Sequence, residues 1–225
     1  MRTFAASPEG RAPGSRRRVP GEGTYAKLMS LFDPDRCDWF DAHVLASSLS
    51  MAGEERGPGQ TSVIEGTGLD GRALGDLLAS HFQGAHGLFG PVDAMSTPSV
   101  PPDEERLREL LASNSTSGLR LEQWLAVIVA RRAQRPNHLW QDLGLRERGE
   151  LSLLMSRHFA PLAACNTQDM KWKKFLYRIL CQDGGLSTCT APTCSECQDI
   201  EACFGEERGA SLLSALRRNE NLVAP

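Results

Sequence analysis

The chain has 225 residues, of which 40% are hydrophobic and 24% are charged, a composition typical of a globular protein with a substantial core. Its net charge of −3 and its isoelectric point of 6.0 argue against a general affinity for nucleic acid or for anionic membranes. Because no window approaches about 18 consecutive apolar residues, a membrane-spanning helix is not expected.

The first 23 residues contain five arginines together with several prolines and glycines. A secretory signal would need an apolar segment after the basic start, and this stretch has none. Glu9, Glu22 and the prolines also disfavour the amphipathic helix of an organelle transit peptide. We therefore expect a disordered basic tail over residues 1–23 and a cytoplasmic protein.

Hydrophobic periodicity predicts helices along almost all of the remaining chain. The predicted helices are 25–32, 38–51, one that begins near Asp70, one that begins at Pro102, 119–135, 138–143, 147–159, 168–182 and 210–218. Residues 61–65 are the one weak candidate for a strand, and the glycine- and proline-rich stretch 83–101 is expected to be a mobile connection. The predicted fold is all-α: a single helical domain over 24–182, followed by a cysteine-rich metal-binding loop and a short C-terminal helix over 183–225.

Four of the seven cysteines fall within one short window. They are Cys189, Cys194, Cys197 and Cys203. In a chain without an export signal, such crowding favours a metal site over a disulfide framework. Structural zinc loops usually have two C-x2-C hooks, whereas this spacing, C-x4-C-x2-C-x5-C, contains one. The first three cysteines follow the spacing of plant-type iron–sulfur clusters, so we favour a cluster and keep zinc as the second candidate.

Three of the four lysines in the chain lie within four residues, just before the cysteine window. On the predicted helix, Lys171, Lys174 and Arg178 share one face. The simplest interpretation is a solvated basic face. The other is an anion-binding or docking surface, because this helix leads directly to the cysteines and a nearby cation would stabilise an all-thiolate cluster.

Four segments closely resemble the NifQ family of nitrogen-fixation proteins. They are HLWQDLGL (138–145), RHFAPLAACN (157–166), MKWKKFLYRILC (170–181) and CTAPTCSECQDIEACFG (189–205). The resemblance covers about residues 120–205, while 24–119 is compatible with the family but carries no signature. One small departure is Ala160, where the family more often has proline.

The resemblance implies a carrier that supplies molybdenum for biosynthesis of the iron–molybdenum cofactor of nitrogenase. It implies a molybdenum–iron–sulfur cluster on Cys189, Cys194, Cys197 and Cys203, which match the family's cysteine motif. The implied partners are the nitrogenase cofactor-assembly scaffold, the nitrogenase reductase and molybdate or another molybdenum source. Binding to nucleic acid or to a membrane is not expected.

Residues beyond the four cysteines are weaker candidates. Lys171, Lys174 and Arg178 are predicted to bind the cofactor or its oxyanion precursor. The secondary candidates for a non-cysteine ligand of molybdenum are His138, His158 and Cys181, although histidines in such positions are more often packing residues. Cys37 and Cys165 are expected to be ordinary small apolar residues.

No catalytic motif is evident, since the chain has no glycine-rich phosphate loop, nucleophile elbow or H-E-x-x-H segment. A carrier or donor protein is therefore predicted rather than an enzyme. The alternative is a zinc-stabilised helical module that binds protein or nucleic acid through the basic 171–178 face.

Overall fold

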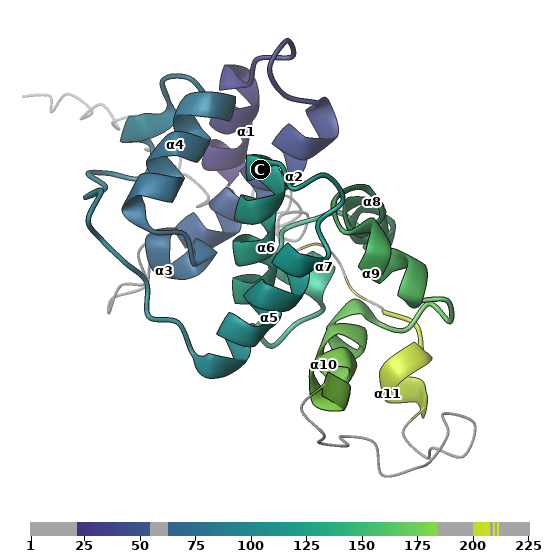
Figure 1. Cartoon of the computed structure of the whole chain (residues 1–225). Coiled ribbons are helices and arrows are strands. Elements are labelled where there is room, and N and C mark those ends of the chain that lie inside the picture. Colours follow the sequence, from purple (N-terminus) through teal and green to yellow (C-terminus); the bar gives the residue numbers. More distant parts are fainter. Residues whose placement is uncertain (1–21, 55–62, 184–199, 208, 210, 212–225) are drawn as a thin grey trace, which may run out of the picture.

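A computed structural model describes residues 22–54, 63–183, 200–207, 209 and 211, which form helices joined by turns (Figure 1). The helices are α1 (Glu22–Leu31), α2 (Trp39–Glu54), α3 (Val63–Thr67), α4 (Gly71–His81), the 3-10 turn η1 (Ala85–Gly87), α5 (Pro102–Ser113), α6 (Arg120–Ala133), α7 (Leu139–Asp142), α8 (Arg148–His158), α9 (Ala160–Cys165), α10 (Trp172–Asp183) and α11 (Ile200–Phe204). Apart from an isolated bridge between Phe32 and Phe82, this part of the chain contains no β-structure. The predicted all-α class is confirmed.

Helix α3 occupies the segment that was expected to be a strand, and this expectation was wrong. Val63 and Ile64 are β-branched, a residue type that favours strands, but both are buried in the helix α3, which packs against α2. Gly66 permits that packing, since a Cβ at this position would lie 2.7 Å from the Cβ of Ala52. Tertiary packing therefore overrides the local preference of the segment.

Two further short helices, α9 and α11, were not expected. The chain turns at Phe159, which ends α8, and Pro161 then occupies the first turn of α9. The stretch 83–101 contains η1 and is tied to its neighbours: Ser99 N donates to Glu65 Oε1 at 3.0 Å. The predicted helix over 210–218 lies almost entirely outside the described residues.

Helices α2 and α6 form the centre of the molecule. All residues from 41 to 52 in α2 are buried, α1 and α3 pack on this helix, and α5 packs on α6. Figure 1 shows α6 running through the middle of the bundle. One continuous hydrophobic core extends from Leu28 to Leu180. None of the described helices combines the length and the apolar character that crossing a bilayer requires.

Buried charged side chains connect the central helices. Arg132 of α6 is almost fully buried, and it donates to the backbone oxygens of Asp142 (2.6 Å) and Gly66 (3.2 Å). Glu104 of α5 is fully buried and accepts a hydrogen bond from Arg131 Nε at 3.1 Å. Each buried charge is thus hydrogen-bonded, as its removal from water requires. These contacts hold α6 in a defined position relative to α3, α5 and α7.

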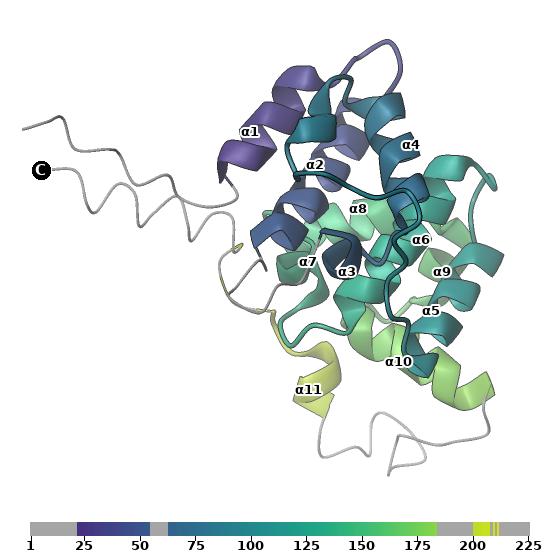
Figure 2. The same ribbon diagram turned by 90° about the vertical axis from the view of Figure 1, so that its left-hand side faces the viewer.

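Both views place α10 and α11 together at one end of the molecule (Figures 1 and 2). The first turn of α10 is anchored to α8, because Trp172 Nε1 donates to Ser152 Oγ at 3.1 Å. Helix α11 in turn is attached to the residue that precedes α10, through a hydrogen bond from Lys171 N to Cys203 O at 2.9 Å. The start of α10 is therefore the structural base on which α11 rests.

Candidate metal site

Of the four cysteines predicted to bind metal, Cys203 is the one whose position is described. Its side chain is a half-buried free thiol in α11 and packs against the edge of the core. Cys189, Cys194 and Cys197 lie outside the described residues, so their role as ligands stays a prediction. Within the described part of the chain, no group of three or more histidine, cysteine or acidic side chains is arranged to hold a metal ion.

Lys171 fixes α11, and with it Cys203, through two contacts. Its backbone N–H donates to Cys203 O, and its Nζ donates to Glu201 O, both at 2.9 Å. One side chain thus satisfies a carbonyl of a five-residue helix that is too short to be stable alone. Helix α11, the next described segment after α10, therefore lies beside the start of α10.

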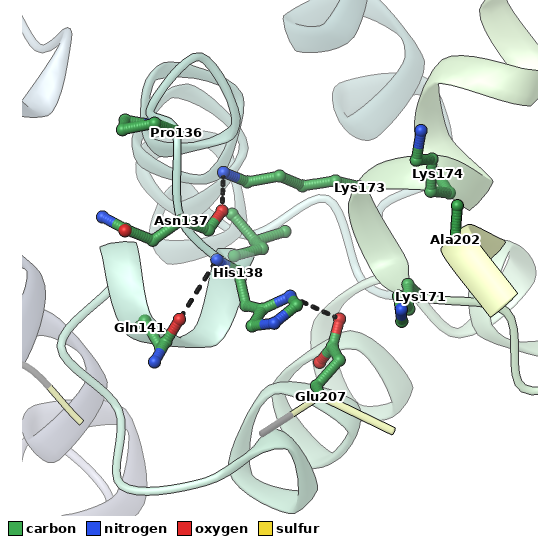
Figure 3. Close-up of a pocket in the computed structure, with 10 residues that line it drawn as sticks. Pro136, Asn137, His138, Gln141, Lys171, Lys173, Lys174, Ala202 and Glu207 are labelled. Atoms are coloured by element: carbon green, nitrogen blue, oxygen red, sulfur yellow. Dashed lines mark hydrogen bonds and ion pairs between the residues drawn. The ribbon is translucent and has the colours of Figure 1, made fainter. Parts of the chain in front are cut away.

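A cavity of about 340 Å³ lies between the start of α7, the start of α10 and α11 (Figure 3). Its charged and polar lining residues are Asn137, His138, Gln141, Lys171, Lys173, Lys174 and Glu207. Ala202 also lines the cavity and directly precedes Cys203. The cavity therefore borders α11, the helix that carries Cys203, although the Cys203 side chain itself packs against the core.

Lys173 is committed to holding this part of the fold together. Its Nζ donates to Asp142 Oδ2 at 2.6 Å, to Arg135 O at 2.5 Å and to Asn137 O. These three bonds use all the N–H groups of the ammonium. Burial lowers the pKa of Lys173 below its ordinary value, and the neighbouring Asp142 carboxylate opposes that shift. Lys173 is thus a structural residue without free capacity for a ligand.

Lys171 and Lys174 differ from Lys173 because neither has a carboxylate partner among the described residues. Lys171 Nζ contacts a neutral carbonyl, and Lys174 is exposed with no hydrogen bond or ion pair in that part of the chain. The acidic group in the cavity, Glu207, faces His138 and Arg148: its Oε1 lies 3.3 Å from His138 Nδ1 and its Oε2 lies 3.7 Å from the Nε of Arg148, which also pairs with Asp169. Lys171 and Lys174 form no ion pair with any described carboxylate, so their charges remain available to an anion.

His138 enters the same cavity from the start of α7. Its backbone N–H donates to Gln141 Oε1 at 3.3 Å, which fixes the backbone from which the ring projects. Its Nδ1 lies 3.3 Å from Glu207 Oε1, and the side chain is 32% exposed (Figure 3). Glu207 was not predicted from the sequence. The one local feature that could have indicated a role near the metal site is its position four residues after Cys203.

His158, the other histidine candidate, is a packing residue. It is buried between α2, α6 and α8, with Nε2 2.9 Å from Asp41 Oδ1 and Nδ1 3.8 Å from Glu122 Oε1. Both ring nitrogens therefore face carboxylates of the core. Both ring nitrogens of His43 also have partners: its Nδ1 lies 2.8 Å from Tyr25 Oη, and its Nε2 lies 3.1 Å from Glu150 Oε2.

Arg178 lines a different cavity from the two lysines with which it was predicted to share a face. This second cavity, of about 540 Å³, is also bordered by Cys165, Phe175 and Ile179. The basic face predicted over 171–178 is thus divided between two cavities. Cys165 is exposed there rather than buried as a small apolar residue would commonly be, and it has no described partner cysteine.

The two remaining described cysteines differ in their surroundings. Cys37 is buried, and burial, with a smaller contribution from the charge of Asp41, raises the pKa of its thiol to about 11. A thiol that resists ionisation is a poor metal ligand, which agrees with the structural role expected for Cys37. Cys181 is half-buried near the end of α10 and remains a secondary candidate.

Comparison with known proteins assigns the chain to one family. The NifQ family model matches residues 44–205. The Protein NifQ homolog of Sinorhizobium fredii is 42% identical over 172 residues, which cover 76% of this chain and 75% of the relative. Protein NifQ of Rhodobacter capsulatus is 39% identical, and the match covers 59% of this chain and 73% of the relative. Protein NifQ of Azotobacter vinelandii is 36% identical, and the match covers 62% of this chain and 77% of the relative. No solved structure matches the chain.

Proposed function

Because the chain belongs to the NifQ family, it is a nitrogen-fixation protein, and we propose that it carries molybdenum on an iron–sulfur cluster. In this proposal it delivers the metal to the scaffold on which the iron–molybdenum cofactor of nitrogenase is assembled, together with the nitrogenase reductase. It acts as a cytoplasmic carrier rather than an enzyme, takes molybdate or another molybdenum source as its cargo, and needs neither nucleic acid nor a membrane.

One observation carries the proposal: the helix that bears Cys203 rests against a cavity with two lysines, Lys171 and Lys174, that form no ion pair with a described carboxylate. A cluster held by Cys189, Cys194, Cys197 and Cys203 would be an anion, because its ligands are thiolates and its bridging atoms are sulfides. Positive charge beside it lowers the free-energy cost of that anion. When bound, the cluster supplies a sulfide-rich surface that can hold molybdenum.

The basic residues have distinct parts in this proposal. Lys171 positions α11 and, with Lys174, attracts the oxyanion in which molybdenum reaches the cell. Arg178 lines the neighbouring cavity and adds positive charge at longer range. Lys173 is excluded from ligand binding because its three N–H groups are already bonded.

The proposal predicts that the cysteine motif is required for both metals. Cys194→Ala and Cys203→Ala, purified without oxygen, should each lose most of the iron, the molybdenum and the visible absorption, because a thiolate ligand is missing. Cys165→Ala is the matched control, since Cys165 is an exposed cysteine outside the motif, and it should keep all three. The measurements are elemental analysis and absorption spectroscopy.

Two outcomes would contradict this proposal. If Cys194→Ala kept its full metal content, the motif would not be the binding site. If the natural chain were colourless and contained zinc in place of iron and molybdenum, it would instead be the zinc-stabilised interaction module, with the basic 171–178 face as its docking surface.

A further inference from the structure

The cavity beside α11 contains a histidine in the environment that metal-binding histidines usually have. We propose that His138 binds the molybdenum cargo through its Nε2 atom. This inference rests on the proposed carrier function and adds to it a specific ligand that the cysteine motif does not include.

The carboxylate of Glu207 sets the state of the His138 ring. Glu207 Oε1 lies 3.3 Å from His138 Nδ1, and the Glu207 side chain is only 5% exposed, with Arg148 at its other oxygen. A buried carboxylate at this position favours the tautomer with the proton on Nδ1, which leaves the lone pair of Nε2 free. Metal-binding histidines commonly have this arrangement, in which the second ring nitrogen donates to a carboxylate.

The other four histidines of the chain, all described, are unsuited to this role. The ring nitrogens of His43 and His158 face a tyrosine hydroxyl or carboxylates. His81 is buried against Trp124 in the core. His86 is exposed, but it lies on η1, which packs against α1 and α4 rather than at the cavity beside α11.

The position of His138 also fits a carrier. Its imidazole and Ala202, the residue before Cys203, line the same cavity, so a ligand there would lie between the two. Lys171 and Lys174 border this cavity and would draw an anionic cargo towards the ring. A neutral imidazole exchanges more readily than a thiolate bridge, so molybdenum held partly by nitrogen could leave while the cysteines keep the iron.

The test compares His138→Asn with the natural chain, both purified without oxygen. His138→Asn should keep its iron and its visible absorption but lose most of its molybdenum. Glu207→Gln, which weakens only the carboxylate that orients the ring, should reduce molybdenum affinity by about tenfold. His86→Asn is the matched control and should change neither metal. Circular dichroism checks that each variant is folded.

A direct readout is X-ray absorption at the molybdenum edge of the loaded protein. The natural chain should show scattering from an imidazole ring, and His138→Asn should not. An unchanged ratio of molybdenum to iron and an unchanged spectrum in His138→Asn would overturn the role of His138 but leave the carrier function intact. Equal loss of both metals would overturn its assignment to molybdenum. Absence of both metals from the natural chain would overturn the carrier function itself, and this inference with it.

Discussion

Two adjacent lysines illustrate how far a residue's role depends on its surroundings. Lys173 is 19% exposed and paired with Asp142, which is 2% exposed, whereas Lys174 is exposed at the mouth of the cavity without a described partner. Helical spacing places Lys173 on a different face from Lys171 and Lys174. It does not reveal the ion pair of Lys173, because Asp142 is distant along the chain and meets Lys173 only after folding. His138 was identified through its segment, but Glu207, whose Oε1 lies 3.3 Å from His138 Nδ1, could not be.

This difference predicts opposite effects on stability. Lys173→Met should lower the free energy of unfolding by about 3 to 5 kcal/mol, because Asp142 would keep a buried charge without its cation. Lys174→Met should change it by no more than about 0.5 kcal/mol. Urea titration followed by circular dichroism measures both. The double variant Lys173→Met with Asp142→Leu removes the uncompensated charge and should recover most of the loss. Equal stability of the two single variants would show that the pair is not buried in solution.

At the scale of helices, the sequence predicted the elements correctly where the limits of an apolar stripe coincide with a proline or a glycine. Helix α5 begins at Pro102 as expected, and Asp70 caps α4, its Oδ1 accepting from Ala73 N at 2.7 Å. Prediction failed for α3, α9 and α11, which have six residues or fewer. These three helices form through tertiary contacts rather than through their own periodicity, so no local pattern indicated them. The four-residue α7 was predicted, as part of 138–143.

The contact between α2 and α3 leads to a prediction about two glycines. Gly66→Ala should lower the free energy of unfolding by about 1 to 3 kcal/mol, because the new methyl group would overlap with Ala52 on the facing helix. Gly75→Ala is the matched control: Gly75 lies inside α4, and a Cβ there meets nothing within 4 Å. It should raise stability by about 0.5 to 1 kcal/mol, since alanine is the better helix former.

Thermal unfolding of the two glycine variants measures both predicted changes, the loss of stability in Gly66→Ala and the gain in Gly75→Ala. A Gly66→Ala protein as stable as the natural chain would mean that α3 does not approach α2 so closely. That result would also reopen the assignment of 63–67 as a helix, since the close approach is what explains why two β-branched residues adopt this conformation.

For the whole molecule, the all-α class followed from composition and periodicity, whereas the assembly of the candidate site did not. The cavity is built from the starts of α7 and α10 and from α11, three segments far apart in the sequence. Their approach depends on single contacts such as Lys173 with Asp142 and Lys171 with Cys203. Long-range contacts of this kind have no periodic signature, so motif spacing identified the cysteines but not the cavity beside them.

Most of the core lies outside the candidate site, and this predicts how the protein responds to metal removal. The buried apolar residues extend from Leu28 to Leu180, while Cys203 and Phe204 pack only against their edge. Chelation should therefore leave most of the helical circular dichroism intact and lower the Tm by no more than about 4 °C, equivalent to about 1 kcal/mol. Cys194→Ala, which is expected to lack the cluster, controls for effects of the chelator itself. Loss of the cooperative transition in the natural chain alone would show that the metal stabilises the whole fold, as in proteins that fold only around their metal.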